Sequence, residues 1–344
     1  MIDLFCGAGG LSLGFKQAGF EVVAGVDSDP QSIDTFALNF PSSLALAADV
    51  SQLSPRDLSR KVGKSKVDVL VGGPPCQGFS VAGKRSESDL RNQLYRDYLR
   101  IVKAFQPRAV VIENVPTIRS LYNGKIAADI ERGLADLGYH VVIGVLNSAD
   151  YGVPQARRRL FFVATRGKET LFELPSPSTG APLTCRDALS DLPGLVGNAG
   201  GPIADYESEA KTDYQRQMRR GSRRLFNHEA VLHKPETVRI ISLVPDGGNY
   251  KDLPKHLWDT RKVNIAWTRM NSQKPSFTID AGHNHHFHYK YNRVPTVREC
   301  ARIQSFPDSF RFLGTRTSQY RQVGNAVPPL LAESIANALR NMLQ

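Results

Sequence analysis

One cysteine stands on a short turn made of glycine and proline. The stretch VDVLVGGPPCQGFS predicts a strand over 67–71 that ends at two glycines and two prolines, with Cys76 directly after them. A thiol presented at the carboxyl end of a strand can act as a nucleophile. The alternative is a small buried side chain, because most free cysteines only pack. Neighbouring reactive groups decide between the two.

Two other predicted strands carry groups that suit a polar heterocycle. AVVIEN ends in Glu113 and Asn114, and YGVPQARRRLFFV has Gln155, Arg157 and Arg159 at the entrance of a strand. A carboxyl group on a ring nitrogen, with a guanidinium on an exocyclic oxygen, would make a base electrophilic towards a thiolate. Considered separately, Glu113 is more simply explained as a solvated acid, and the arginines as part of a basic surface.

The N-terminal stretch DLFCGAGGLSLGF predicts a strand, a glycine-rich turn and a helix. Gly7, Gly9 and Gly10 would let the backbone approach a ligand at the end of the strand. Asp27 follows about 20 residues later, where a carboxylate can bind ribose hydroxyls, and Asp49 ends another apolar stretch. These acids favour a nucleoside cofactor over an empty turn. The glycines do not match G-x-G-x-x-G, which counts against a nicotinamide dinucleotide.

The elements that must position these groups are short strands alternating with helices. The predicted strands are IDLF, EVVAGV, VDVLVGG, AVVIEN, HVVIGVL and RLFFVAT. Their alternation with helical patterns predicts the α/β class, with a doubly wound, mostly parallel sheet. DLRNQLYRDYLRIVKAFQP has apolar residues at helical spacing and predicts a crossover helix closed by Pro107.

Composition divides the chain into three parts. After residue 166, ELPSPSTGAPL and LPGLVGNAGGP hold more Pro, Gly and Ser than buried strands carry, and basic residues outnumber acids over 211–239. From about residue 296 the α/β character returns and ends in an amphipathic helix. We expect a first domain over 1–166, a second, smaller domain over 167–291, and a C-terminal segment over 292–344 that returns to the first domain.

The totals bound the class of protein. A chain of 344 residues with 41% hydrophobic residues fits one large core or two domains. It has neither an apolar run of about 18 residues nor a secretory signal, so we expect a cytoplasmic protein with no membrane partner. Its four cysteines form no CxxC pair, which argues against a disulfide framework or a thiolate zinc site. The net charge of +11 favours an acidic partner, most commonly nucleic acid.

In order along the chain, the motifs identify a family. The sequence resembles the DNA (cytosine-5) methyltransferases over nearly its whole length. The motifs that carry the resemblance are DLFCGAGG, GGPPCQGFS, ENV, QARRR, RECARIQSFPDSF and GNAVPP. The resemblance implies an S-adenosylmethionine-dependent, Rossmann-like fold. Residues 1–166 would then bind the cofactor and catalyse, and residues 167–291 would be the target-recognition domain.

The cofactor implied by the resemblance is S-adenosylmethionine, with S-adenosylhomocysteine as product and no metal. The residues implied to surround it are Phe5, Gly7, Gly9, Gly10, Leu11, Asp27, Asp49, Pro74, Asn325 and Val327. Asp27 would bind the ribose and Asp49 the adenine amine. The family commonly has Glu at the position of Asp27, so this chain departs from the pattern by one methylene there.

The resemblance also assigns roles in catalysis. Cys76 would be the nucleophile towards C6 of cytosine, Glu113 would engage N3, and Arg159 would bind O2. Arg157 would contact the nucleophile loop or the phosphate of the target nucleotide. A stacked base cannot reach both the thiol and the methyl donor, so the cytosine would be flipped out of the duplex, and the cramped turn would hold Cys76 near it.

Several residues are expected to contact DNA. Gln77, Ser80 and Arg91 would belong to the loop that closes on it. Four arginines of the middle region are predicted to be either phosphate contacts or solvated surface: Arg219, Arg220, Arg223 and Arg224. The stretch AGHNHHFHYK also holds four histidines, His283, His285, His286 and His288. A polar loop beside DNA explains them better than a metal cluster, since no Cys or carboxylate completes a ligand set.

The implied function is sequence-specific DNA (cytosine-5-)-methyltransferase activity on double-stranded DNA. Its expected setting is a bacterial restriction-modification system, with a monomeric enzyme at the nucleoid in the cytoplasm and a cognate restriction endonuclease acting on the same site. Three alternatives stay open: a tRNA cytosine-5 methyltransferase, a non-catalytic DNA-binding protein on the same fold, and a nicotinamide oxidoreductase. The basic middle region favours DNA over RNA. The presence of Cys76, Glu113 and Arg159 together disfavours a non-catalytic binder, and the PPC turn and the arginine cluster disfavour an oxidoreductase.

Overall fold

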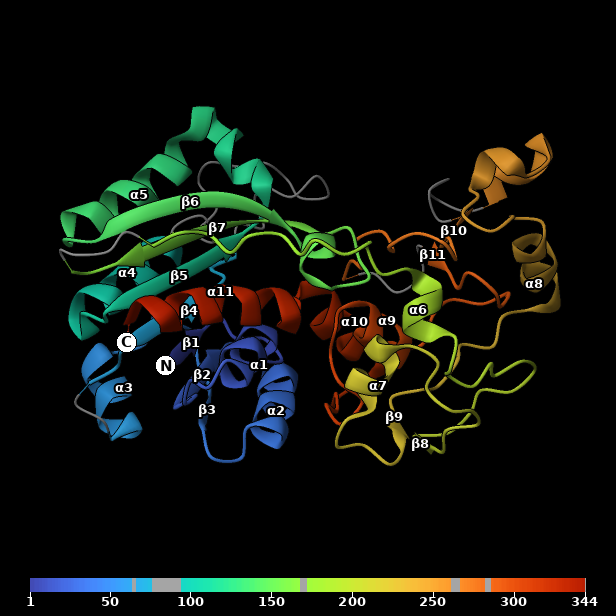
Figure 1. Cartoon of the computed structure of the whole chain (residues 1–344), viewed down its shortest axis with the longest axis horizontal. Helices are drawn as coiled ribbons and strands as arrows, with labels where there is room; N and C mark the ends of the chain where they lie inside the picture. Colours follow the sequence, from blue (N-terminus) through green and yellow to red (C-terminus); the bar gives the residue numbers. More distant parts are fainter. Residues whose placement is uncertain (64–65, 76–93, 168–171, 261–266, 282–285, 344) are drawn as a thin grey trace. The chain divides into compact units, whose positions relative to one another are not determined.

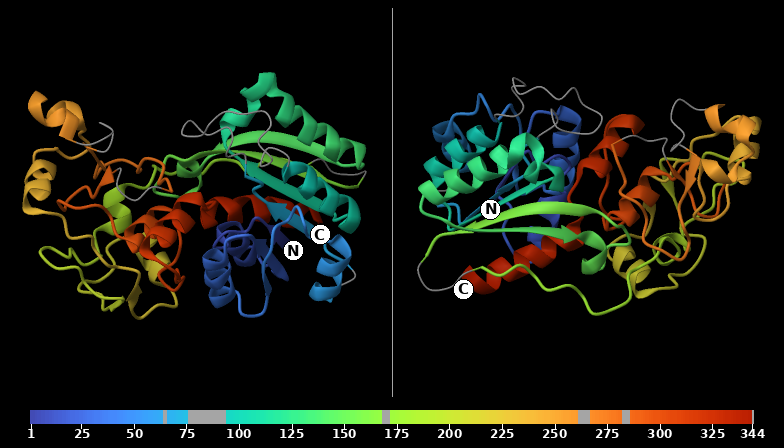
Figure 2. Two further views of the ribbon diagram at one scale, coloured as in Figure 1. Left: turned by 180° about the vertical axis from the view of Figure 1, so that it is seen from behind. Right: turned by 90° about the horizontal axis from the view of Figure 1, so that it is seen from above.

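A computed structural model describes residues 1–63, 66–75, 94–167, 172–260, 267–281 and 286–343 of the chain. Its elements fall into two compact units, whose ribbons are shown in Figure 1 and Figure 2. Unit 1 contains residues 1–147, 158–177 and 329–344, and unit 2 contains residues 148–157 and 178–328. Among the described residues, no helix is both long enough and apolar enough to cross a lipid bilayer.

A seven-stranded sheet is the frame of unit 1 (Figure 1). The strands are β1 (Ile2–Leu4), β2 (Ala24–Asp27), β3 (Leu44–Ala47), β4 (Val69–Gly72), β5 (Ala109–Asn114), β6 (His140–Asn147) and β7 (Arg158–Thr165). Their order is β3-β2-β1-β4-β5-β7-β6, and β7 is the one strand of this sheet that runs in the direction opposite to the others. The predicted α/β class with a mostly parallel sheet is confirmed. The order reverses between β1 and β4, where open sheets of this kind bind ligands.

Two features of the sheet differ from the prediction. The sequence LALA forms β3, although it has no β-branched residue and was not predicted as a strand. The antiparallel direction of β7 follows from its connection to β6. Residues 148–157 are fewer than the dozen or more that a parallel crossover needs, so β7 turns back beside β6.

The helices of unit 1 cover both faces of the sheet. They are α1 (Gly10–Gln17), α2 (Pro30–Asn39), α3 (Pro55–Val62), α4 (Leu94–Phe105), α5 (Lys125–Asp136) and α11 (Pro329–Leu343), with short 3-10 turns at η3 (Pro116–Arg119) and η4 (Leu121–Gly124). Helix α4 confirms the predicted crossover helix: Tyr98, Ile101 and Val102 are fully buried, and Gln106 leaves the helical conformation at φ 45°. Residues 89–93 of that prediction lie outside the described residues.

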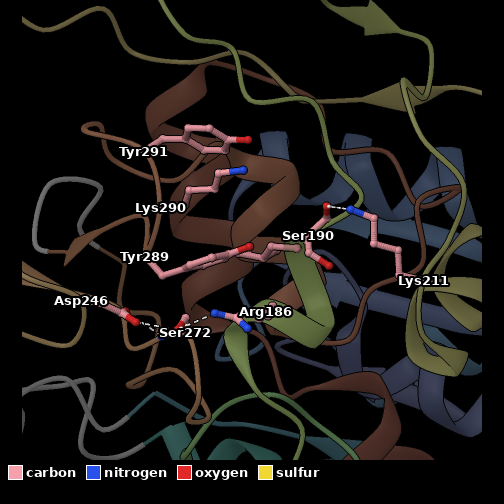
Figure 3. A pocket seen from close by; sticks show the side chains of 9 residues that line it. Arg186, Ser190, Lys211, Asp246, Ser272, Tyr289, Lys290 and Tyr291 are labelled. Carbon is pink, nitrogen blue, oxygen red and sulfur yellow. Dashed lines mark hydrogen bonds between the residues drawn. The ribbon is translucent and has the colours of Figure 1, made fainter.

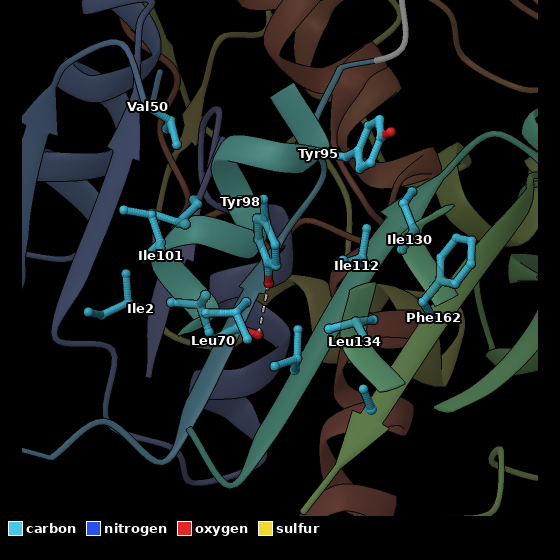
Figure 4. Close-up of a cluster of buried hydrophobic side chains, with 14 of the residues drawn as sticks. Ile2, Val50, Leu70, Tyr95, Tyr98, Ile101, Ile112, Ile130, Leu134 and Phe162 are labelled. Atoms are coloured by element: carbon cyan, nitrogen blue, oxygen red, sulfur yellow. Dashed lines mark hydrogen bonds between the residues drawn. The ribbon is translucent and has the colours of Figure 1, made fainter. Parts of the chain in front are cut away.

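Alternation along β1 assigns the two faces. Ile2 and Leu4 join the apolar cluster that α4 and α5 cover, shown in Figure 4. Asp3, between them, points to the other face and accepts a hydrogen bond from Ser12 Oγ of α1 at 2.7 Å. Helix α11 packs against α1 at Gly14, so the C-terminal helix belongs to unit 1.

Unit 2 consists of short elements and long connections. They are η5 (Ser148–Tyr151), α6 (Cys185–Leu189), β8 (Ile203–Ala204), α7 (Asp213–Arg219), β9 (Leu225–Phe226), α8 (Pro235–Ser242), η6 (Tyr250–Asp252), η7 (Lys255–Thr260), β10 (Thr268–Arg269), β11 (His286–Phe287), α9 (Val297–Ile303) and α10 (Arg316–Asn325). An apolar cluster around Ile241, Trp267 and Phe287 forms one core of this unit. Such low regularity fits the Pro-, Gly- and Ser-rich sequence of the region.

Buried ion pairs hold much of unit 2 together. Arg302 of α9 lies 3.1 Å from Asp191 and 2.6 Å from Asp308, and all three side chains are fully buried. Glu299 pairs with Arg293 at 2.7 Å. These contacts place residues 292–328 in unit 2, whereas the prediction drawn from composition grouped them with 329–344. The functional assignment of residues 1–166, 167–291 and 292–344 stays a prediction.

Candidate active site

An acid and a guanidinium meet on neighbouring strands of unit 1. Glu113 of β5 lies opposite Phe161 of β7, so Arg159, two residues from Phe161, is its diagonal neighbour on the same face. Arg159 Nε lies 2.8 Å from Glu113 Oε1, and both side chains are only 13–14% exposed. The predicted partners of a polar heterocycle are therefore brought together, in a place largely shielded from water.

The turn that precedes Cys76 lies against the same strand end. A Cβ added at Gly73 would come within 2.9 Å of Glu113 Oε2, so the carboxylate lies close over this glycine. Asn114 Nδ2 donates a hydrogen bond to the carbonyl of Pro74 at 3.1 Å, and Asn114 is 6% exposed. Asn114 thus anchors the turn, and Glu113 lies close beside it. Cys76 itself lies outside the described residues.

Arg157 is buried in unit 2. Its Nη1 donates to the carbonyl of Ile279 at 3.0 Å and its Nη2 to the carbonyl of Gly324 at 2.7 Å. Gln155 forms a similar hub: its amide nitrogen donates to Gln304 Oε1 at 2.7 Å, and its amide oxygen accepts from Ile279 N. These bonds tie the QARRR motif to the segments that carry the two closing motifs. The predicted contact of Arg157 with the nucleophile loop or a phosphate stays a prediction.

A second group of predicted residues lies at the carboxyl ends of β1 and β2. Asp27 accepts hydrogen bonds from the backbone N–H groups of Gly7 and Asp29, each at 2.9 Å, one on each carboxylate oxygen. Burial raises the pKa of Asp27, while these two bonds lower it. A Cβ added at Gly7, where φ is 51°, would meet no atom within 4 Å, so open space lies beside the turn. The turn at Gly7 therefore borders an open space beside the Asp27 carboxylate, and we call this space the cradle.

Asp3, on the strand that leads into this turn, is a buried acid that the sequence did not single out. Asp3 is 1% exposed, and burial raises its pKa to about 7 despite the hydrogen bond from Ser12. Burial also raises the pKa of the Cys6 thiol well above its usual range, which disfavours the reactive thiolate form. The signal for Asp3 was available, since an acid between Ile2 and Leu4 interrupts an apolar strand.

A model of the C-5 cytosine-specific DNA methylase family matches residues 1–341. The chain belongs to this family. The match spans both units and includes every motif quoted above. Glu113, Arg159 and the turn before Cys76 all lie within the matched residues.

Relatives and solved structures agree with the assignment. The type II methyltransferase M1.HphI of Haemophilus parahaemolyticus is 42% identical over 99% of this chain and 86% of its own length. M.DdeI of Desulfomicrobium norvegicum is 37% identical over 98% of this chain and 88% of its own length. The solved structure of a prophage-encoded DNA modification methyltransferase of E. coli matches with a TM-score of 0.85 and 30% identity, over 99% of this chain and 98% of that one.

A more distant likeness concerns the fold alone. S. pombe Dnmt2 methyltransferase matches with a TM-score of 0.63 at 16% identity, over 100% of this chain and 98% of that one. The methylase fold is thus that of S-adenosylmethionine-dependent methyltransferases, with the Rossmann-like sheet expected from the motifs.

The cradle in unit 1 fits the cofactor of that fold. Phe5 and Gly7 have left-handed backbone conformations at φ 60° and 51°, which open the turn beside Asp27. The Asp27 carboxylate accepts backbone hydrogen bonds from Gly7, Ser28 and Asp29, and two carboxylate oxygens with about four acceptor sites leave capacity for one ribose hydroxyl. Asp49 is exposed just after β3, and its Oδ1 accepts from Ser51 N at 2.8 Å. Gly9, Gly10 and Leu11 line the start of α1, whereas Asn325 and Val327 belong to unit 2 and keep their predicted cofactor role as a prediction.

The four arginines predicted to touch DNA are not equivalent. Arg219 lies 2.6 Å from Asp191 and stacks 3.9 Å from the ring centroid of Tyr206, and its side chain is only 15% exposed. Arg224 pairs with Asp205 at 3.0 Å. Arg220 and Arg223 are exposed, and no carboxylate of the described residues lies within 4.0 Å of either. Gln77, Ser80 and Arg91 lie outside the described residues, so all seven contacts stay predictions.

The histidine stretch is only partly a polar loop. His283 and His285 lie outside the described residues. His288 is 1% exposed; its Nδ1 accepts hydrogen bonds from the backbone N–H groups of Lys290 and Tyr291, and burial lowers its pKa to about 3. The expectation of a polar loop is therefore wrong for His288, which is a core residue of unit 2. Within the described part of the chain, no three His, Cys, Asp or Glu side chains are grouped to hold a metal.

Proposed function

We propose that this methylase transfers a methyl group from S-adenosylmethionine to C5 of a flipped-out cytosine in double-stranded DNA, at one specific sequence, through a covalent adduct of Cys76. The Glu113–Arg159 pair beside the Pro74 turn carries this proposal. A protein that only bound DNA would need neither a shielded acid at a strand end nor an amide bracing the turn before a cysteine. Family membership already makes DNA cytosine the substrate class.

The protein's own groups would perform the covalent steps. The Cys76 thiolate would bond to C6, and the electron pair of the C5–C6 double bond would move towards C4 and N3. Glu113 would share a proton with N3, and Arg159 would donate a hydrogen bond to O2. Both contacts would stabilise the negative charge that develops on the ring. This activates C5, which is otherwise a poor nucleophile.

S-adenosylmethionine, held by the Gly7 turn and Asp27, would supply an electrophilic methyl group to C5. Loss of the C5 proton to a base would then return electrons to the ring and expel the Cys76 thiolate, which regenerates the enzyme. The Glu113–Arg159 ion pair in the described structure is the resting arrangement. Cytosine would take over part of Arg159's hydrogen bonding, because the guanidinium has five N–H donors.

The setting of the enzyme follows from its relatives. Because M1.HphI and M.DdeI are type II methyltransferases, we propose a bacterial restriction-modification role with a cognate endonuclease for the same site. A monomer acting at the nucleoid in the cytoplasm fits this role, since one catalytic site takes one flipped base. The likeness to Dnmt2 concerns the fold alone and says nothing about the substrate.

The test is covalent trapping on duplex DNA that contains 5-fluorocytosine. The fluorine cannot leave as a proton does, so the adduct should accumulate as a species resistant to denaturing gel electrophoresis. We expect adduct with the wild-type protein and S-adenosylmethionine, and none with Cys76→Ser. An adduct formed equally by Cys76→Ser would show that Cys76 is not the nucleophile.

A further inference from the structure

A cavity within unit 2 gathers three cationic side chains around a wall of tyrosines (Figure 3). We call it the basic cavity; its volume is about 410 Å³. The residues that define it are Arg186, Lys211, Asp246, Tyr289, Lys290 and Tyr291. They come from segments far apart in the sequence, and none of them belongs to the motifs of the family.

The charges around the basic cavity are unbalanced. Three cations face one carboxylate, and that carboxylate is already engaged: Asp246 accepts from Ser272 N at 2.8 Å and from Ser272 Oγ at 2.5 Å. Among the described residues, no acid lies within 4.0 Å of the Arg186, Lys211 or Lys290 nitrogens. Like charges around one hollow raise its positive potential, which an anion would lower.

The cations have hydrogen-bonding capacity to spare. Lys211 Nζ donates to the carbonyl of Ser190 at 3.1 Å, and Lys290 Nζ lies 5.3 Å from the ring centroid of Tyr291. Each ammonium has three donors, so each keeps at least two for a ligand. Arg186 Nη2 lies 3.4 Å from Ser272 Oγ, and the side-chain amide oxygen of Gln273 accepts from Arg186 Nη2 at 2.9 Å and Nη1 at 3.1 Å, which leaves the remaining N–H groups of the guanidinium for a ligand.

The size and openness of the basic cavity suit a ligand larger than a free ion. Arg186, Lys211 and Lys290 are exposed, whereas Leu189 and Ser272 are buried, so the cations form an open rim above a closed floor. Figure 3 shows Tyr289, Lys290 and Tyr291 side by side on one wall. Lys, Arg and Tyr side chains are the usual donors to backbone phosphates of DNA, and lysine binds phosphate as a point charge.

We propose that the basic cavity binds a phosphate group, and that in the working complex this phosphate belongs to the DNA backbone. The DNA part rests on the proposed function. The cavity would thus fix the position of unit 2 on the duplex without reading its sequence. It would share that task with Arg220 and Arg223, and it replaces Arg219, whose guanidinium is already paired and stacked.

The test removes both lysine charges and keeps their aliphatic stems, in the double variant Lys211→Met, Lys290→Met. Its matched control is Lys251→Met, Lys255→Met, which removes two exposed lysines of unit 2 outside the cavity. Affinity for a labelled duplex is measured by fluorescence anisotropy over a series of NaCl concentrations. Loss of one phosphate contact should reduce the slope of log K against log[NaCl] by about 0.9 in the cavity variant alone. Equal slopes in the two variants would overturn the proposal.

A second arm separates the two sources of phosphate. Titration calorimetry with pyrophosphate should give heat with the wild-type protein and none with the cavity variant, and equal heats would overturn the anion site. Loss of pyrophosphate heat with an unchanged DNA slope would assign the cavity to a free phosphate ligand and overturn its role on DNA. Methylation by the wild-type protein is measured separately, so failure of the proposed function is visible apart from both arms. Thermal unfolding of both variants checks that they fold.

Discussion

The two oxygens of Glu113 face different partners. Oε1 is 2.8 Å from Arg159 Nε, and Oε2 lies over Gly73 at the start of the cysteine turn. The arginine favours the ionised carboxylate, whereas a role at N3 needs a proton shared with the base. Cytosine O2 would draw some of Arg159's donors away from the acid, which weakens the hold of the arginine on the carboxylate, so that Glu113 could take up a proton from solvent and share it with N3.

Replacing the acid by its amide tests this role. Glu113→Gln keeps the shape of the side chain but cannot hold the charge or pass a proton, so single-turnover methylation should slow by about 10²–10⁴-fold. Calorimetry should show unchanged binding of S-adenosylhomocysteine. Glu131→Gln, on the exposed face of α5, is the matched control and should behave as wild type. A rate for Glu113→Gln within twofold of the wild type would refute the assigned role.

Asn114 offers a test of positioning. Asn114→Ala removes the hydrogen bond that Asn114 Nδ2 donates to the Pro74 carbonyl and the one that Asn114 Oδ1 accepts from Val115 N, at a cost of about 1 kcal/mol for each bond lost. Since Cys76 lies two residues further on, adduct formation with fluorocytosine DNA should slow by more than the loss of stability explains. Asn39→Ala breaks a similar amide-to-carbonyl bond at the end of α2 and should leave the adduct rate unchanged. Equal rates in both variants would limit Asn114 to a structural role.

Asp3 makes stability depend on pH. Its folded pKa of about 7 lies above the ordinary 3.8, so between these values the unfolded chain ionises this acid while the folded chain keeps it protonated. The fold therefore loses stability as pH rises through this window, by about 4 kcal/mol at most. Asn at this position can still accept from Ser12 and carries no charge to bury.

The measurement is the free energy of unfolding in urea at several pH values. Relative to wild type, Asp3→Asn should gain stability steadily from pH 4 to pH 7 and show no further gain above it. Asp68→Asn, at an exposed position before β4, serves as the control. A constant difference between Asp3→Asn and wild type across this range would mean that Asp3 is not protonated in the fold.

At the scale of elements, the C-terminal helix α11 packs closely against α1, and one glycine of α1 makes this close contact possible. A Cβ added at Gly14 of α1 would lie 2.4 Å from Ala332 Cβ and 2.5 Å from the backbone of Glu333 and Pro329. Backbone atoms of α11 cannot move aside as a flexible side chain does. The close approach of the two helices therefore requires glycine at this position.

Gly14→Ala should separate α1 from α11. Overpacking of this kind costs about 1–3 kcal/mol, even though alanine favours the helix itself. Urea unfolding monitored by circular dichroism should show the loss, and Gln17→Ala, on the exposed side of α1, should show none. Because α1 begins in the cofactor turn, S-adenosylhomocysteine should also bind more weakly to Gly14→Ala. A variant as stable as wild type would contradict the packing described for these helices.

The elements that the sequence predicted are those with a local pattern. Helix α4 repeats apolar residues at helical spacing, and the strands before Gly73 and Asn114 are β-branched runs. Strand β3 was missed because LALA has no such residues and pairs only through β2. The direction of β7 was missed although its signal is local, because the connection over 148–157 is too short for a parallel crossover.

The same holds for the candidate site: residues within short motifs were predicted, and contacts between segments far apart in the chain were not. The motifs predicted Glu113, Arg159 and the Pro74 turn, because each stands within a few residues of a strand end. They did not predict the Asn114 bond to Pro74, which joins β5 to the turn after β4. The pairing of Arg219 with Asp191 and the basic cavity were also missed, since both are assembled from segments far apart in the chain.

At the scale of the whole molecule, the net charge of +11 agrees with family membership in pointing to DNA. Some of the basic residues are internal, however: Arg157, Arg298 and Arg302 are fully buried and bind carbonyls or carboxylates within unit 2. A count of basic residues thus overstates the surface that DNA can use. The exposed Arg220 and Arg223 and the rim of the basic cavity are the better measure.

The central claim is that this chain methylates cytosine C5 in DNA at a defined sequence. The most direct test is single-base mapping of methylcytosine on plasmid DNA after incubation with the purified protein and S-adenosylmethionine. The account predicts 5-methylcytosine at every copy of one short motif, and at none after incubation with Cys76→Ser. Unmethylated plasmid, with S-adenosylhomocysteine binding intact, would contradict it and identify the chain as a methylase fold that acts on RNA or binds without turnover.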